Sequence, residues 1–143
     1  MTEQNVAIVH RWFDEVWNNR REDLIEELLS EDSIAHGLLD VSGKAPRGHE
    51  GFKNLLYAFS NAFPDLRIIV DDVICENDFV VARCTVTGTH RGIGIGVDAT
   101  GKQVNFTGLC MMKLSNGKIV EVWNQFDFIN MYQQLGVLSL TLG

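Results

Sequence analysis

Cysteine is scarce in this 143-residue chain, and no two cysteines have the CxxC spacing that marks many redox and metal sites. Cys75, Cys84 and Cys110 are odd in number, and each lies in an apolar run that is typical of a strand. A free thiol in such a run packs as a small hydrophobic group. We therefore expect structural thiols, rather than reactive or metal-binding ones, in a reducing cytoplasm.

The sequence also lacks metal and cofactor motifs. Its four histidines stand at positions 10, 36, 49 and 90, with no HxH or HExxH pair to place two ligands on one face. The glycine-rich run 92–101 joins two expected antiparallel strands, so it lacks the strand-to-helix geometry that cradles phosphate. No Ser-His-Asp or Cys-His arrangement stands out. We expect neither a metal nor a cofactor.

Basic clusters and long hydrophobic runs are missing as well. The net charge is -7 at neutral pH, and no Lys/Arg-rich segment is present, which argues against nucleic acid as a partner. The longest apolar stretches fall short of the roughly 20 residues that span a bilayer. The first residues lack the basic and apolar parts of a signal peptide. We expect one domain over residues 1–143, cytoplasmic and without a membrane partner.

The first half of the chain has the pattern of helices. Apolar side chains recur at three- and four-residue steps over residues 6–17, which predicts an amphipathic helix. A shorter helical stripe covers residues 24–29, and residues 33–39 are strand-like. A third helix fits residues 50–63, and Pro64 ends it.

The second half has the pattern of strands. Four long strands are predicted, at residues 66–76, 79–90, 102–114 and 118–128. The Asn116-Gly117 pair is a strong hairpin signal, and long neighbouring strands with tight turns predict an antiparallel meander. Helices followed by a curved sheet make an α+β domain. One sheet face would cover the helices; the other would stay partly apolar, which suggests a homodimer or a larger homo-oligomer.

Asp127 is the unusual polar residue of the last strand, because it stands between two phenylalanines and four residues after Trp123. Side chains alternate along a strand, so Trp123 and Asp127 point to the same face. The carboxylate can be a helix N-cap, or half of a structural ion pair. It can also lie in an apolar pocket, where a raised pKa would suit proton abstraction from carbon.

Eight segments spread over nearly the whole chain share an order and spacing with a known family. They are WFDEVWN (12–18), AH (35–36), GHEGF (48–52), AFPDL (62–66), VVARCTVTGTHRG (80–92), ATGK (99–102), GKIVEVWNQFD (117–127) and QLG (134–136). In these segments the chain resembles the SnoaL-like polyketide cyclases, some of which are described as ester cyclases, within the nuclear-transport-factor-2-like superfamily. The resemblance implies a cone-shaped barrel, with three N-terminal helices packed on a curved, mostly antiparallel sheet around a deep pocket.

The resemblance also implies an activity: a cofactor-independent cyclase or isomerase that performs an intramolecular aldol condensation on a hydrophobic, polyketide-like substrate. In the characterised cyclases an aspartate at the end of the last long strand is the general acid/base, and Asp127 matches that position. His36 is either a core histidine or a donor to a substrate oxygen. His90 either points into the pocket mouth, where it would also stabilise that oxygen, or simply ends a strand. Arg83 binds a substrate oxygen or pairs with a carboxylate such as Asp127, and Trp123 forms a wall of the pocket.

Three aromatic residues of the helices, Trp12, Phe13 and Phe59, are expected to complete the apolar walls of the substrate site. Two other functions remain open. A protein of the same fold could bind a small hydrophobic molecule without catalysis. An enzyme like limonene epoxide hydrolase would need a second carboxylate two residues after Arg83, where Thr85 stands.

Overall fold

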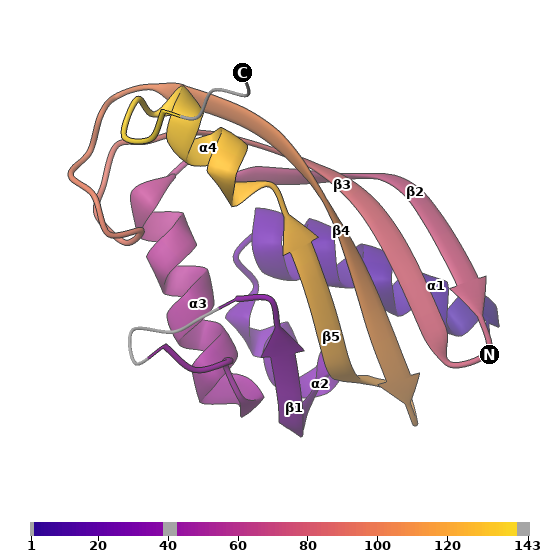
Figure 1. Ribbon diagram of the computed structural model, residues 1–143. Coiled ribbons are helices and arrows are strands. Elements are labelled where there is room, and N and C mark those ends of the chain that lie inside the picture. Colours follow the sequence, from indigo (N-terminus) through magenta and orange to yellow (C-terminus); the bar gives the residue numbers. More distant parts are fainter. Residues whose placement is uncertain (1, 39–42, 140–143) are drawn as a thin grey trace.

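The computed structural model describes residues 2–38 and 43–139 and has helices packed inside the curve of one sheet (Figure 1). The N-terminal half consists of α1 (Thr2–Arg11), η1 (Trp12–Asn18), η2 (Glu22–Leu24), α2 (Ile25–Leu28), β1 (Leu29–His36) and α3 (Gly48–Ala62). The C-terminal half consists of β2 (Arg67–Glu76), β3 (Phe79–Thr89), β4 (Gln103–Ser115), β5 (Lys118–Phe126) and α4 (Phe128–Gln134). The predicted α+β class, with three helical segments before a meander, is confirmed.

The sheet has the strand order β1-β5-β4-β3-β2. Strands β2 to β5 are antiparallel neighbours, whereas β1 pairs with β5 in parallel. Asn116 and Gly117 both have positive φ, 52° and 78°, as a tight hairpin between β4 and β5 requires. The parallel pairing places β1 beside the last strand, so residues about 90 positions apart in sequence become neighbours at the site.

The two faces of the sheet differ in burial. Along β4 the pattern alternates without a break, with each even-numbered residue buried and each odd-numbered one exposed. The buried set faces the helices and supplies Val104, Phe106, Cys110, Met112 and Leu114 to the core. We call this helix-covered side the concave face and the opposite side the outer face.

The predicted helix over residues 6–17 is continuous, but its hydrogen bonding changes from α to π at Trp12. In a π-helix the bonds join residues five apart, so Trp12 and Trp17 are brought to one side. Both indoles pack on Phe52 of α3, with ring centroids 4.5 and 5.4 Å away. Asn18 then fixes the end of η1 to the sheet, because its amide exchanges two 2.7 Å hydrogen bonds with the backbone of Ile68.

The second helix is shorter than the predicted stripe over residues 24–29. Helix α2 ends at Leu28, and Leu29 already pairs with Ile119 as the first residue of β1. Leu28 and Leu29 are both buried. Because buried leucines stand on both sides of the change from helix to strand, hydrophobic periodicity alone could not locate that change.

Candidate functional site

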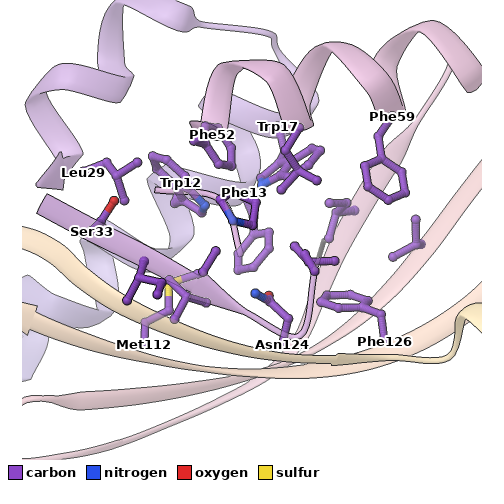
Figure 2. Close-up of a pocket in the computed structure, with 18 of the residues that line it drawn as sticks. Trp12, Phe13, Trp17, Leu29, Ser33, Phe52, Phe59, Met112, Asn124 and Phe126 are labelled. Carbon is purple, nitrogen blue, oxygen red and sulfur yellow. The ribbon is translucent and has the colours of Figure 1, made fainter. Parts of the chain in front are cut away.

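An apolar cavity lies between η1, α3 and the concave face of the sheet (Figure 2). The volume of this cavity is about 80 Å³. Figure 2 shows Phe59 and Phe126 at one end, Leu29 and Ser33 at the other, and Asn124 between them. The indole rings of Trp12 and Trp17 contribute to the helical wall.

Polar groups are few in the lining of this cavity. Ser33 supplies a hydroxyl and Asn124 a side-chain amide, and the indoles of Trp12 and Trp17 each carry one N–H. None of the described lining residues is an Asp, Glu, His, Lys, Arg, Cys or Tyr. A site of this composition can hold an apolar molecule and orient one or two oxygens, but its side chains offer no titratable group near neutral pH.

Asn124 is the polar group best placed to orient a ligand. It lies on β5, is only 9% exposed, and its Nδ2 donates a 2.9 Å hydrogen bond to the carbonyl oxygen of His36. Gly37 makes this approach of β1 possible, because a Cβ there would lie 2.0 Å from the Asn124 carbonyl oxygen. An amide has a second donor and an acceptor, so Asn124 can also bond a ligand oxygen in the cavity.

Four phenylalanines gather at one end of the cavity. The ring of Phe128, the first residue of α4, lies 5.9 Å from Phe59, 6.0 Å from Phe106 and 6.3 Å from Phe126. These rings come from α3, β4, β5 and α4. We call them the aromatic end of the cavity.

The structure places three of the predicted substrate-binding residues in the cavity lining. Trp12 and Phe13 reach it from η1, and Phe59 reaches it from α3. All three lie on the apolar sides of their helices, where the sequence pattern had placed them.

Asp127 is not among the lining residues of the cavity, and its side chain has the first of the arrangements that its sequence allowed, the helix N-cap. Its side chain is exposed and caps α4, because one carboxylate oxygen accepts a 3.1 Å hydrogen bond from the backbone N–H of Asn130. A shallow hollow on the outer face has Asp127, Gln125 and Arg83 among its lining residues. The reason is strand alternation, because Val122, Asn124 and Phe126 take the cavity side of β5.

The same alternation moves three other predicted residues out of the lining. Trp123 lies on the outer side of β5 and stacks on His36, with centroids 5.4 Å apart. His36 Nε2 is 2.6 Å from Glu121 Oε2, so the imidazole has a carboxylate partner rather than a cavity ligand. Arg83 pairs with Asp72 of the neighbouring strand, not with Asp127.

His90 is fully buried, but it is not part of the cavity lining. Its Nδ1 accepts a 3.2 Å hydrogen bond from the backbone N–H of Thr100, and its ring packs 5.4 Å from Phe63. The residue therefore joins the end of β3 to the far end of the glycine-rich loop. His90 directly follows the last residue of β3, so its position is that of the strand-end interpretation.

Sequence reasoning missed Asn124, Ser33, Phe126 and Phe128 as cavity residues. A signal for them was present on β5: one alternating set contains Val122, Phe126 and Phe128, and the other contains Glu121, Gln125 and Asp127. The more apolar set is the one expected to face helices. Trp123 obscured this signal because an indole also suggests a pocket wall.

No helix among residues 2–38 and 43–139 is long and apolar enough to cross a membrane. Over the same residues, no group of three or more His, Cys, Asp or Glu side chains could hold a metal ion.

The helices packed on a curved five-stranded sheet define an α+β cone of the nuclear-transport-factor-2-like type. The model of the SnoaL-like polyketide cyclase family matches residues 7–135. The chain therefore belongs to the SnoaL-like polyketide cyclase family.

Similar proteins of this family come from several bacteria. The chain is 25% identical over 123 residues to the aklanonic acid methyl ester cyclase DnrD of Streptomyces peucetius, covering 85% of this chain and 84% of DnrD. A structure classed as a SnoaL-like polyketide cyclase, from Jannaschia sp. CCS1, superposes with a TM-score of 0.85 at 25% identity, covering 96% of this chain and 95% of that one. IdmH of Streptomyces antibioticus, described as a polyketide cyclase, gives a TM-score of 0.80 at 30% identity, covering 94% and 99%.

Proposed function

We propose that this protein is a cofactor-independent cyclase- or isomerase-type enzyme whose substrate is a small, hydrophobic, carbonyl-bearing molecule held in the apolar cavity. The observation that carries the proposal is the cavity itself, aromatic-walled and with one buried amide at Asn124. The similarity to ester and polyketide cyclases supports ring closure as the reaction.

In the proposed reaction the cavity confines a flexible chain so that two of its carbons meet. A C–H beside one carbonyl loses its proton, and the resulting enolate carbon forms a bond to a second carbonyl carbon. The oxygen of that second carbonyl then takes up a proton, so the addition conserves all atoms of the substrate. Orientation of this kind can supply a large share of a rate enhancement.

Asn124 would contribute by donating its second Nδ2 hydrogen to the oxygen on which negative charge develops. A preorganised donor in a water-poor site stabilises such charge more than water does. Because the described lining has no titratable side chain, we assign the proton acceptor to water or to an oxygen of the substrate itself.

The test uses an open-chain diketone that can close to a ring. The compound 1-phenylhexane-1,5-dione gives 3-phenylcyclohex-2-enone after aldol addition and loss of water, and the conjugated product is followed by its ultraviolet absorbance. We expect the wild-type protein to bind the diketone, seen as a change in tryptophan fluorescence from Trp12 and Trp17, and to accelerate closure. Asn124→Leu should lower both effects.

Two results would redirect the proposal. If the diketone binds but closes to the ring no faster than in buffer alone, the protein is better described as a binding protein for hydrophobic molecules, the second function that the fold allows. If neither the diketone nor any aromatic ketone binds, the proposal fails altogether.

A general acid/base role of Asp127 is a separate hypothesis, because it requires the substrate to bind in the shallow hollow on the outer face that Asp127 lines, and not in the apolar cavity. Asp127→Asn retains a good N-cap but removes the base. A stable Asp127→Asn protein without turnover would support the aspartate mechanism. Full turnover would assign Asp127 to the helix cap alone. An epoxide hydrolase is not proposed, because Arg83 pairs with Asp72 outside the cavity.

We also propose that a second copy of this chain covers the outer face. Four large apolar side chains are exposed there, with Ile69 and Ile74 on β2 and Leu109 and Met111 on β4. Arg83 forms an ion pair with Asp72, and His36 is hydrogen-bonded to Glu121, so these polar side chains already have partners within the face. Sedimentation of the wild type and of Leu109→Glu tests this: a monomeric wild type would exclude the homodimer.

A further inference from the structure

Gly108 of β4 lies directly beneath the aromatic end of the cavity. It pairs in register with Phe126 of β5, and by the alternation of β4 it faces the concave side. The ring of Phe126 occupies the space that a side chain at position 108 would need. A Cβ built on Gly108 would lie 2.1 Å from Phe126 Cδ1, 2.4 Å from Cγ and 2.6 Å from Cε1.

Such close contact explains why glycine stands inside a long strand, where it normally weakens packing. Cross-strand pairs in which an aromatic ring covers a glycine are a known stabilising arrangement in sheets. Here the ring is also a cavity wall, because Phe126 is part of the lining. Figure 2 shows the Phe126 ring just above the strand, at the same end of the cavity as Phe59.

We propose that Gly108 and Phe126 together set the length of the cavity at its aromatic end, and so determine how many fused rings a ligand can place there. With glycine at 108, the Phe126 ring lies flat against the sheet and leaves the space above it free. Any larger residue at 108 forces the ring upward, toward Phe128 and into the volume that a ligand would use.

The chemistry of the aromatic end indicates what it would take. Rings stack at offset or edge geometries with centroids 4.5–7 Å apart, and the rings around Phe128 already have such spacings among themselves. A flat aromatic or polyunsaturated ring system can continue this packing, while its carbonyl oxygen reaches back to Asn124. This inference rests on the proposed function, since it concerns the substrate of the same cavity.

The experiment compares three ketones that differ in ring number: acetophenone with one ring, 1-tetralone with two and anthrone with three. Dissociation constants are measured by quenching of tryptophan fluorescence for the wild type and for four variants. Gly108→Ala should weaken the binding of anthrone by about tenfold or more and that of acetophenone by less than about threefold, because a shorter cavity excludes the longer ligand first. Phe126→Leu should shift the preference the other way, toward anthrone.

Rescue separates a size determinant from simple damage to the fold. In the double variant Gly108→Ala/Phe126→Leu the smaller side chain leaves room for the new methyl group, so anthrone binding should return to within about threefold of wild type. Thr107→Ala, on the outer face of the same strand, is the matched control and should leave all three constants unchanged.

The outcomes distinguish the two proposals. If wild type binds none of the ketones, the proposed function fails and this inference with it. If wild type binds them, but Gly108→Ala and Phe126→Leu change all three affinities by one common factor or not at all, Gly108 and Phe126 do not set the ring number. Should Gly108→Ala not fold, the opposite shift expected of Phe126→Leu still decides the question.

Discussion

The two faces of one sheet carry opposite kinds of chemistry, although they are built from the same strands. On the concave face, Asn124 is the one polar side chain of β5 that meets the cavity, and the residues around it are apolar. On the outer face, Glu121 and Gln125 of β5 and Asp127, which follows the strand, are at least partly exposed. Glu121 is hydrogen-bonded to His36, and Asp127 accepts a hydrogen bond from the backbone N–H of Asn130. Burial therefore decides which polar group can meet a ligand held in the cavity: Asn124 lines the cavity, whereas the three polar side chains of the outer face do not.

The strongest way to test this contrast uses two adjacent methionines of β4. Met112 is 2% exposed on the concave face, and Met111 is 36% exposed on the outer face. Met112→Ala should lower the free energy of unfolding by about 2–5 kcal/mol, because it leaves a cavity in the core. Met111→Ala should change it by no more than about 0.5 kcal/mol.

Urea denaturation at two protein concentrations measures both values. A concentration dependence in the wild type and in Met112→Ala that is weaker in Met111→Ala would reveal self-association through the outer face. Equal losses for the two variants, independent of concentration, would contradict the assignment of the faces.

Asp127 provides the next largest expected effect. Asp127→Ala removes the cap of α4 and should cost about 1 kcal/mol of stability, whereas Asp127→Asn should cost only a few tenths. Loss of the cap should also loosen Phe128, the first residue of the helix, and weaken ketone binding. Thermal unfolding and fluorescence titration of both variants measure these changes. Identical behaviour of the two variants would show that the cap is not what Asp127 contributes.

The order of the secondary structure could be predicted from the sequence because hydrophobic periodicity is a local property. The helix over residues 50–63 and the Asn116-Gly117 hairpin are examples, since each depends on residues close together in the chain. The π-helical turn at Trp12 was not predictable in this way. It depends on the packing of two indoles on Phe52, which lies about 40 residues further along the chain.

The site was harder to predict because it depends on the face that each strand turns to the helices. Alternation assigns Trp123 and Asp127 to one side but does not say which side is covered. Trp12, Phe13 and Phe59 lie in the cavity lining because the apolar stripe of a helix is its buried side. Asn124 was missed because its role follows from its environment: an amide is ordinary on a surface and becomes distinctive only when it is enclosed.

A smaller effect is expected from the matched pair Asn124 and Gln125, adjacent residues on opposite faces of β5. Asn124→Leu should weaken binding of 1-tetralone by about threefold to tenfold, the net value of one lost hydrogen bond. Gln125→Leu should leave the affinity unchanged, because that side chain is exposed on the outer face. Fluorescence titration compares the two. Equal weakening by both variants would mean that the ketone binds outside the cavity.

The smallest expected effect concerns the three thiols, and it distinguishes the centre of the concave face from its edge. Cys84 and Cys110 are buried, whereas Cys75 on the edge strand β2 is only partly buried. A hydrogen bond with Cys110 and burial both raise the pKa of Cys84 well above its ordinary value. Because the thiolate is the reactive form, Cys84 should stay unreactive across the neutral range.

Iodoacetamide should therefore alkylate Cys75 first in the native protein, as mass spectrometry of peptides would show, and should leave the fold intact. Modification of Cys84 at the rate of Cys75 would mean that the centre of the concave face is open to solvent, which would contradict the burial of Cys84.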